Sequence, residues 1–360
     1  MGIKKSSFYR VYKNIMSKIL ITSTQYPYYG GAATNSYALV KYLRFHGHTV
    51  ACIFFENKDV VVDIDNIGGV FRIGDRDSKQ MAVKIIEKYL KGTPDIILSK
   101  NYAAPVISGP MFPGVKNVYL VTGSPQMSEL SSRNISSVSY TESRMEPLFF
   151  APEASCVKKA DLVIPNSHQA SKILIKNYGK NKKIKQPIDT SMAFNHKIEI
   201  GKKFSDREID IAFICSNLNR PVKNSKLALK LMSNKSFKSN KKVVIGEGSN
   251  IFAGVSNCKK YNLMNQTEVI KIIQNSKLVI CTSYYDASPN VIKEAIMAGS
   301  NILVSNNCGW SELYPDSSVC SDIYDVDEWV EKSASLIKSE SRVEINHDFS
   351  SLLRSINGII

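Results

Sequence analysis

The 360-residue sequence lacks several features that would place it in well-known protein classes. No apolar run reaches the roughly 18 residues that a membrane-spanning helix needs, so we expect no transmembrane segment. The basic N-terminus has no long apolar stretch, which argues against a signal peptide. Neither G-x-G-x-x-G after a predicted strand nor G-x-S-x-G occurs. A dinucleotide fingerprint and a hydrolase nucleophile elbow are therefore excluded.

Cysteine and histidine do not occur in patterns typical of metal binding or catalysis. The seven cysteines are scattered without a C-x-x-C pair, and most lie in apolar runs. Buried free thiols are the expected state, rather than disulfides or metal ligands. Free thiols favour a reducing compartment, so we predict a cytoplasmic protein. The five histidines have no paired partners in the sequence, and we expect surface or helix-capping roles, as at His46.

Acidic residues are too few to balance the basic ones, and the net charge is +15. Residues 158–203 include eleven lysines and only three acidic residues. Such an excess is typical of a solvated lysine-rich surface, and it also attracts anionic membranes or nucleic acid. Interleaved aromatic residues and nucleic-acid motifs are missing, so we expect no nucleic-acid partner. Peripheral contact with an anionic membrane stays open beside the solvated surface.

Short apolar runs alternate with helical patterns through most of the chain. Strands are predicted at Lys18–Ser23, Thr49–Phe55, Asp95–Ser99, Asn117–Val121, Asp161–Pro165, Ile209–Cys215, Lys241–Gly246, Lys277–Cys281 and Asn301–Ser305. Helices are predicted at Ala32–His46, Ser78–Lys91, Ser167–Tyr178, Ser225–Met232, Gln266–Asn275, Pro289–Ala298, Asp327–Ser339 and Phe349–Ile356. This alternation predicts an α/β protein with parallel sheets covered on both faces.

A polar, lysine-rich stretch around residues 180–190 is the best candidate for a linker between two domains. We therefore predict Rossmann-like domains at 17–190 and 191–330, with their parallel sheets facing across a ligand-binding cleft. Residues 1–16 form a basic extension in this scheme. Residues 331–360 form C-terminal helices that pack back on the first domain.

The segment 283–295 is the most informative part of the chain. It follows a predicted strand and leads into a helix, and it carries Asp286 and, eight residues later, Glu294. Open parallel sheets bind ligands at the carboxyl ends of their strands. Ser288 and Pro289 suit the N-cap and first position of the helix, whose N–H groups attract phosphate. The pattern predicts an anion site flanked by two carboxylates.

Four other loops follow predicted strands. Arg220 and Lys223, three residues apart, combine a guanidinium fork with a point charge and could hold a diphosphate. Gly30 and Gly31 indicate either a tight turn or a loop that faces a substrate or phosphate. Glu247 lies between two glycines, which could approach a nucleotide or simply form a turn. The loop with Trp310 leaves open whether this ring packs on a sugar or in the core.

These motifs together resemble the GT-B glycosyltransferases, in particular the large retaining group called glycosyltransferase family 4, over most of residues 17–345. The resemblance rests on Tyr26-Pro27 with Gly30-Gly31, Leu43-Arg44-x-x-Gly47-His48-x-Val50, Ala160 to Ser167, Arg220 with Lys223-Asn224, and Asp286-x₇-Glu294-Ala295. The last is similar to the family's E-x₇-E signature, with Asp in place of the first Glu.

The resemblance implies transfer of a sugar from a nucleotide-sugar donor to a glycan, lipid-linked or other hydroxyl acceptor, with retention and without a metal or cofactor. By the family's pattern, Glu294 holds the ribose hydroxyls and Asp286 contacts hydroxyls of the donor sugar. The backbone of Ser288, Pro289, Asn290 and Val291 meets the phosphates. Lys223, helped by Arg220, stabilises the departing diphosphate.

Three positions depart from the family's pattern. Ser216-Asn217 stands where a Gly-Arg pair is common, so Arg220 is expected to substitute. Asp286 is one methylene shorter than Glu, which bears on the choice of sugar. No histidine occurs near residues 121–124, where many members carry one. Two alternatives therefore stay open: a nucleotide-sugar epimerase of related architecture, and a non-catalytic partner subunit of a glycan-assembly complex.

Overall fold

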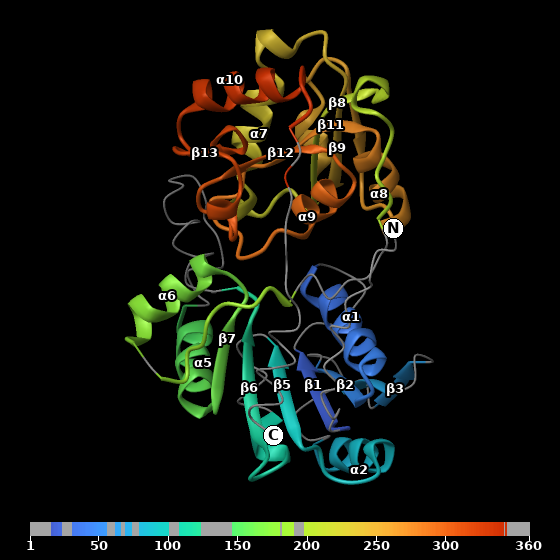
Figure 1. Ribbon diagram of the computed structural model, residues 1–360, viewed down its shortest axis with the longest axis vertical. Helices are drawn as coiled ribbons and strands as arrows, with labels where there is room; N and C mark the ends of the chain where they lie inside the picture. Colours follow the sequence, from blue (N-terminus) through green and yellow to red (C-terminus); the bar gives the residue numbers. More distant parts are fainter. Residues whose placement is uncertain are drawn as a thin grey trace, which may run out of the picture.

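The computed structural model describes residues 16–23, 31–55, 62–65, 69–73, 79–100, 108–123, 146–180, 182–190, 198–341 and 343. Two α/β units lie one above the other along the long axis of the molecule (Figure 1). The first half of the chain, blue to green, forms one unit, and the second half, yellow to red, forms the other.

The first unit is built on a seven-stranded sheet. Its strands are β1 (Lys18–Ser23), β2 (Thr49–Phe55), β3 (Val62–Asp65), β4 (Val70–Ile73), β5 (Ile96–Lys100), β6 (Lys116–Val121) and β7 (Leu162–Pro165). They follow the order β3-β4-β2-β1-β5-β6-β7. All neighbours pair in parallel except β3 and β4, which are antiparallel. The prediction of a parallel sheet is thus confirmed for the strands from β4 to β7, and wrong for the edge strand β3.

The second unit is built on a six-stranded sheet in which every pair is parallel. Its strands are β8 (Ile209–Asn217), β9 (Lys242–Glu247), β10 (Cys258–Tyr261), β11 (Ser276–Cys281), β12 (Asn301–Ser305) and β13 (Val319–Cys320). The order is β10-β9-β8-β11-β12-β13. Successive strands are added on one side of β8 up to β10, and on its other side from β11 onward. Open parallel sheets bind ligands where the strand order changes in this way, here between β8 and β11.

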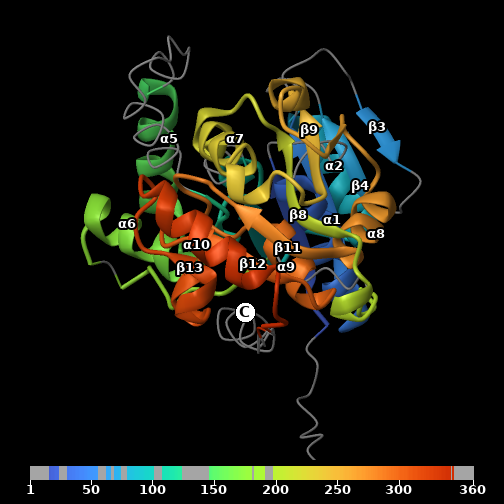
Figure 2. The same ribbon diagram turned by 90° about the horizontal axis from the view of Figure 1, so that it is seen from above.

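Helices flank both sheets. They are α1 (Gly31–Phe45), α2 (Lys79–Leu90), α5 (Glu146–Lys159), α6 (His168–Tyr178), α7 (Ser225–Met232), α8 (Gln266–Gln274), α9 (Asn290–Met297) and α10 (Val326–Leu336). Short 3₁₀ helices lie at Gly109–Met111, Phe204–Asp206, Pro221–Lys223, Lys235–Phe237, Ser249–Phe252, Ser311–Leu313 and Asp316–Ser318. Seen from above, α5 and α6 lie on one side of the molecule, and β3 and α8 lie on the other (Figure 2).

The central strands are continuous apolar runs because helices cover both faces of each sheet. Alternate residues of β8 enter different cores: Ile211 packs with α7 and α10, and Ala212 packs with α8 and α9. In β1, Ile19 and Leu20 divide in the same way between two cores of the first unit. Burial on both faces removes the alternation of polar residues that an exposed sheet would show.

The predicted strands and helices within the described residues are confirmed to within a few residues at each end. Four strands and one helix were not predicted: β3, β4, β10, β13 and α5. The strands are short and lie at or next to sheet edges, where polar residues such as Lys259 and Lys260 of β10 mask the apolar pattern. Helix α5 contains Pro152 in its interior, which argues against a helix in the sequence alone. The predicted helix at 349–356 lies outside the described residues.

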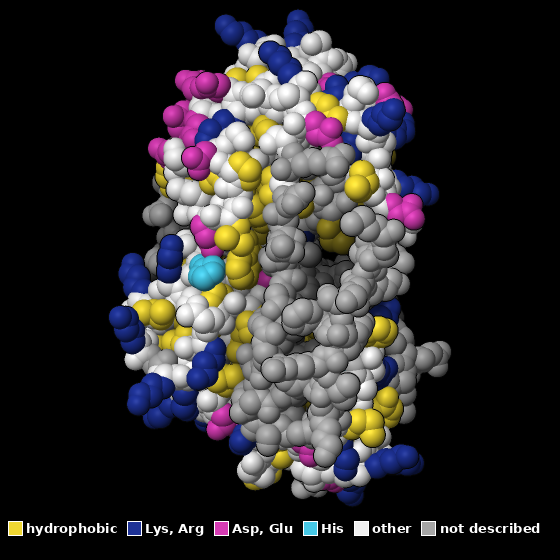
Figure 3. Space-filling view, in the orientation of Figure 1, with side chains coloured by type: hydrophobic (Ala, Val, Ile, Leu, Met, Phe, Trp, Pro, Cys, Tyr) yellow, Lys and Arg dark blue, Asp and Glu magenta, His cyan; other side chains and the backbone are white. Residues whose placement is uncertain are grey.

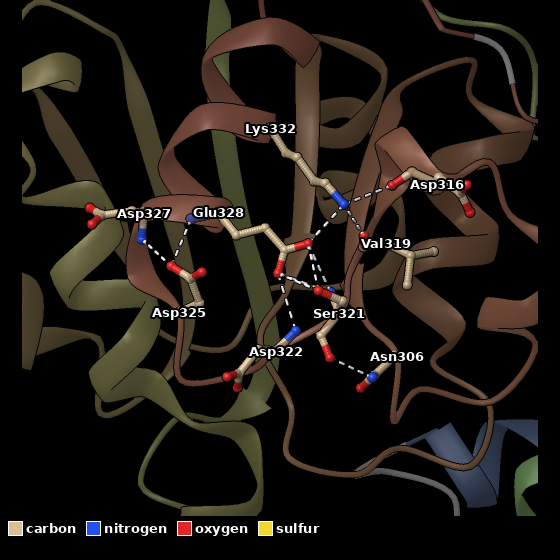
Figure 4. A network of polar contacts seen from close by, with 9 residues as sticks. All are labelled: Asn306, Asp316, Val319, Ser321, Asp322, Asp325, Asp327, Glu328 and Lys332. Carbon is tan, nitrogen blue, oxygen red and sulfur yellow. Dashed lines mark hydrogen bonds and ion pairs between the residues drawn. The ribbon is translucent and has the colours of Figure 1, made fainter.

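A polar network fixes α10 to the segment that follows β13 (Figure 4). The Glu328 carboxylate accepts hydrogen bonds from the backbone N–H of Ser321 at 2.9 and 3.0 Å and from that of Asp322 at 3.1 Å. Lys332 lies 2.9 Å from Glu328 and also donates to the Val319 carbonyl at 2.5 Å. Asp325 caps the start of the helix by accepting from two backbone N–H groups. These contacts therefore hold α10 against the segment that follows β13.

All seven cysteines lie in the described part of the chain and are free, and five of them are buried. The prediction of free thiols in apolar surroundings is confirmed for these five. No helix among the described residues is long and apolar enough to cross a membrane. The first sheet spans residues 18–165 and the second spans 209–320, while the predicted boundary near residue 190 stays a prediction.

Candidate functional site

The carboxyl ends of the second sheet carry most of the predicted site residues. The chain reaches Arg220 and Lys223 after β8, Glu247 at the end of β9, and Asp286 after β11. This edge of the sheet faces the first unit, whose own strands end toward it (Figure 1). Residues that are far apart in the sequence therefore meet at the boundary between the two units.

Lys223 and Asp286 are in direct contact. Lys223 Nζ lies 2.6 Å from Asp286 Oδ2, and the two side chains are 19% and 18% exposed. Burial raises the pKa of Asp286, but the Lys223 ammonium and the N–H of Ser288 outweigh it, so this pKa lies below its usual value. Burial lowers the pKa of Lys223, but the Asp286 charge outweighs this effect and the pKa lies above its usual value. Both groups are charged at neutral pH.

The end of β11 holds the loop that carries Lys223. Thr282 Oγ1 donates to the carbonyl of Lys223 at 3.0 Å and to that of Asn224 at 3.2 Å. The N–H of Tyr284 donates to the Val222 carbonyl at 2.8 Å. Sequence reasoning missed Thr282, because nothing in its own segment indicates that its hydroxyl supports a loop 58 residues away. These bonds give Lys223 a fixed backbone beside Asp286.

Glu294 lies on α9 and is partly buried. Its Oε1 accepts a hydrogen bond from Gln266 Nε2 at 2.7 Å. Burial raises the pKa of Glu294, and the hydrogen bond from Gln266 and the charge of Lys293 oppose this without cancelling it. Gln266, the first residue of α8, was not predicted as part of the site. Its contribution depends on the packing of α8 beside α9, which no local pattern reveals.

Helix α9 begins one residue later than predicted. Pro289 occupies the N-cap position and Asn290 is the first helical residue, so the prediction that Ser288 caps this helix is wrong. No side chain caps α9. The Ser288 hydroxyl instead donates to Asp189 Oδ1 at 3.2 Å, and its N–H donates to Asp286 Oδ1 at 3.2 Å. Val291 packs against the core beneath the helix. Without a side-chain cap, the first N–H groups of α9 remain suited to an anion.

The remaining predicted residues have different surroundings. Arg220 is exposed and its charge helps to lower the pKa of Asp286. Glu247 is exposed and accepts from Asn217 Nδ2 at 3.0 Å. A Cβ on the neighbouring Gly246 would lie 2.0 Å from the Cys215 carbonyl oxygen, so this glycine permits close approach of β9 to β8. Whether the segment around Glu247 also approaches a nucleotide stays a prediction.

The glycine pair of the first unit is only partly described. Gly31 is the first residue of α1, and Gly30 lies outside the described residues. The proposed contact of this loop with a substrate or phosphate accordingly stays a prediction.

Trp310 belongs to the boundary between the units. The residue is 7% exposed and its ring lies at 5.4 Å, nearly perpendicular, from the ring of His168 at the start of α6. Its φ of 70° places it in the left-handed region, at the N-cap of a 3₁₀ helix. Of the two interpretations left open by the sequence, burial in a packed contact is the one this structure supports.

A buried lysine of the first unit was not predicted. Lys100 ends β5 and is 0% exposed. Burial lowers the pKa of its ammonium group to about 7, and the nearby Cys52 thiol acts in the opposite direction. Because β5 ends toward the second unit, this titratable group lies on the side of the first sheet that faces the boundary. No sequence pattern distinguishes Lys100 from a lysine at the solvated end of a strand.

The described residues contain no group of three or more His, Cys, Asp or Glu side chains that could hold a metal ion. Whether the reaction requires a metal or cofactor stays a prediction from the sequence.

Solved structures of low sequence identity share this architecture along nearly their whole length. A sucrose-phosphate synthase from Thermosynechococcus elongatus has a TM-score of 0.66 at 11% identity, covering 95% of this chain and 98% of that chain. The lipopolysaccharide outer core galactosyltransferase WaaB, in its apo form, gives 0.65 at 14% identity, with 96% and 100% covered. HepE from Anabaena in complex with UDP gives 0.62 at 12% identity, with 96% and 99% covered. No curated protein matches this sequence.

At such low identities the structural similarity defines the fold, and the fold is GT-B, as predicted. A family model described as glycosyl transferases group 1 matches residues 197–351. The matched segment contains the second sheet together with Arg220, Lys223, Asp286 and Glu294. These findings support a GT-B glycosyltransferase.

Proposed function

We propose that this protein transfers a sugar from a nucleotide-sugar donor to an acceptor hydroxyl, with retention at the anomeric carbon and without a metal. The observation that carries the proposal is the ionised contact of Lys223 with Asp286, beside the start of α9. It lies in the segment that matches glycosyl transferases group 1 and at the edge where open parallel sheets bind ligands.

The largest electrostatic demand of this reaction is negative charge on the departing diphosphate. As the bond between the anomeric carbon and the phosphate oxygen breaks, the Lys223 ammonium and the exposed Arg220 guanidinium stabilise that oxygen. The uncapped N-terminus of α9 provides further N–H donors. The acceptor oxygen bonds to the anomeric carbon on the same face, and its proton passes to the departing phosphate. Atoms and charge balance without an external base.

The two carboxylates would bind different parts of the donor. Glu294 would accept hydrogen bonds from the ribose hydroxyls, while its Oε1 also accepts from Gln266 Nε2. Asp286 would keep Lys223 charged and accept from hydroxyls of the donor sugar. The shorter Asp286 still reaches Lys223, which favours a catalytic site over the non-catalytic partner subunit.

The acceptor is a glycan, a lipid-linked sugar or another hydroxyl compound, and we propose that the protein works in the cytoplasm at an anionic membrane surface. Lys and Arg side chains gather on the first unit near α5 and α6 (Figure 3). The exposed lysines there include Lys158, Lys159, Lys172 and Lys176. A patch of this kind attracts anionic headgroups within a Debye length.

Thermal unfolding in the presence of UDP, GDP, ADP and their sugars tests the donor site. A ligand at about 100 times its Kd stabilises the folded state by about 2.7 kcal/mol, which raises Tm by several degrees. We expect one nucleotide to raise Tm in this way in the wild type. The same nucleotide should not raise Tm in Glu294→Ala. Turnover with the matching nucleotide-sugar then separates transfer from epimerisation, because an epimerase changes the sugar without an acceptor. Absence of any shift would support the partner-subunit alternative.

A further inference from the structure

A buried ion pair joins the two units beside the proposed donor site. Lys293 Nζ lies 2.6 Å from Asp189 Oδ2 and 2.8 Å from Asp189 Oδ1, and the two side chains are only 4% and 2% exposed. The Ser288 hydroxyl joins them, since it donates to Asp189 and accepts from Lys293. These three residues therefore form one polar cluster.

The two charges belong to different units. Asp189 follows Ile188, whose N–H donates to the Pro165 carbonyl at the end of β7 at 2.8 Å. The Ile188 side chain packs in a core of the first sheet. Lys293 lies on α9 in the second unit, 104 residues further along the chain. Moving one unit relative to the other would separate the two charges.

Stability alone is a weak reason for such a pair. Burial lowers the pKa of Lys293 even though Asp189 opposes this effect, so desolvation outweighs the attraction. Buried ion pairs are often no more stable than apolar residues of the same size. The pair does fix the position of Lys293 relative to Asp189, since two buried charges are stable only when they stay in contact.

The cluster continues into the proposed catalytic pair. Lys293 holds the hydroxyl of Ser288, and the N–H of Ser288 donates to Asp286 Oδ1 at 3.2 Å. The other oxygen of Asp286 contacts Lys223 at 2.6 Å. An unbroken series of polar contacts therefore connects Asp189 in the first unit to Lys223 in the second.

Two more contacts hold the same loop against the first unit. Asn290 Nδ2, at the start of α9, donates to Asn35 Oδ1 of α1 at 3.0 Å. Ile173 of α6 packs with Val222, Tyr285 and Ala287, which flank Lys223 and Asp286 in the sequence. The segment that carries the proposed donor site thus touches the first unit on several sides.

We propose that Asp189 and Lys293 are a positioning pair, which sets Ser288, Asp286 and Lys223 in their reactive arrangement only when the two units meet as they do here. The pair acts through Ser288 and does not contact the reacting atoms. The effect of the pair on reaction rate rests on the proposed glycosyl transfer. Its effect on the loop that carries Ser288 and Asp286 rests on the contacts alone. It makes the donor site dependent on a residue of the first unit.

Asp189→Asn tests the proposal, with Asp210→Asn as its control. Asp210 forms an ion pair with Lys277 at 2.8 Å inside the second unit, at the amino ends of β8 and β11. We expect Asp189→Asn to lower kcat roughly ten- to hundredfold with the nucleotide-sugar identified by thermal unfolding, since small displacements of a reactive arrangement cost this much. Asp210→Asn should lower Tm and leave kcat unchanged.

The double variant Asp189→Asn/Lys293→Met separates positioning from folding. It removes the stranded buried charge, so Tm should recover relative to Asp189→Asn while kcat stays low. Recovery of kcat together with Tm would mean that the pair is merely structural and would overturn the proposal.

Amide hydrogen exchange provides a readout that needs no activity. We expect Asp189→Asn to speed exchange in residues 286–293, and Asp210→Asn to leave this segment unchanged. Unchanged exchange in Asp189→Asn would overturn the positioning role whatever the enzyme does. Faster exchange in a protein that transfers no sugar would support the positioning role and contradict the proposed function.

Discussion

Lys223 and Asp286 are both partly buried and both charged. Burial disfavours the charged form of both groups, yet each stabilises the charged form of the other. A lysine kept charged in a partly desolvated place interacts with a phosphate more strongly than one in bulk water. The contact therefore prepares a cation at the carboxyl end of the sheet before any ligand arrives.

Lys223→Ala should lower turnover roughly 10²- to 10³-fold while the fold persists, because the proposed function makes Lys223 the main charge opposite the departing diphosphate. Steady-state kinetics with the identified donor and circular dichroism measure the two effects. Lys277→Ala is the matched control, since Lys277 has a similar exposure and pairs with Asp210 away from the site. Wild-type turnover in a folded Lys223→Ala protein would rule out the leaving-group role.

At the scale of elements, close backbone approach at the ends of β11 and β12 shapes the site. The N–H of Gly309 donates to the Asp286 carbonyl at 2.7 Å. A Cβ on Gly309 would lie 1.8 Å from the Ala287 carbonyl oxygen and 2.8 Å from Ser167 Cβ in the first unit. The absence of a side chain at Gly309 thus lets the loop after β12 support the loop that carries Asp286.

Gly309→Ala should destabilise the protein by about 1–3 kcal/mol through this overlap, and should lower turnover by displacing Asp286. Gly254→Ala adds a Cβ that meets nothing within 4 Å and should change stability by less than about 0.5 kcal/mol. Urea denaturation compares the two variants. Equal stability of both would show that the loop relaxes around the added methyl group.

The network around Glu328 predicts a defined dependence of stability on pH. Burial raises the pKa of Glu328, but hydrogen bonds from Ser321 and Asp322 and the contact with Lys332 lower it from 4.5 to about 2. Because this pKa is lower in the folded protein, the carboxylate contributes fully above about pH 4.5. The contribution is lost as pH falls toward 2.

Glu328→Gln should therefore lower Tm at pH 7, and the difference from the wild type should shrink as pH falls from about 4.5 toward 2. Thermal unfolding at several pH values measures this trend. A difference in Tm that stays constant over that range would contradict the assigned pKa.

The elements also show how far sequence patterns extend. The central strands and their helices were predictable because burial on both faces leaves continuous apolar runs, as in β1 and β12. The edge strands β3, β10 and β13 were not, since two to four residues with polar neighbours carry little pattern. The start of α9 was misassigned because Ser288 is a good N-cap in isolation, and its hydroxyl is used by Asp189 and Lys293 instead.

At the scale of the whole molecule, the first unit presents a basic surface beside the boundary with the second. Lys172 and Lys176 are both exposed on α6 and lie four residues apart, hence on one side of the helix. Their charges add to those of α5, and the resulting field reaches an anionic surface over about 10 Å at 0.1 M salt.

The protein should co-sediment with vesicles that contain anionic lipid, and binding should fall as salt rises. Lys172→Glu/Lys176→Glu should weaken binding, whereas Lys235→Glu/Lys238→Glu, the same change of charge on exposed lysines of the second unit, should not. Co-sedimentation that depends on neither anionic lipid nor salt would remove the membrane proposal.

The sequence by itself determined the alternation of strands and helices, the two sheets and the presence of basic and acidic residues at strand ends. These features follow from short-range patterns, in which the spacing of apolar residues reports which faces are buried. Only the tertiary structure decided which of the charged groups meet. Lys223 with Asp286, Glu294 with Gln266, and Lys293 with Asp189 are 63, 28 and 104 residues apart. Such contacts depend on how sheets and units pack, and no local pattern encodes the partner of a charge.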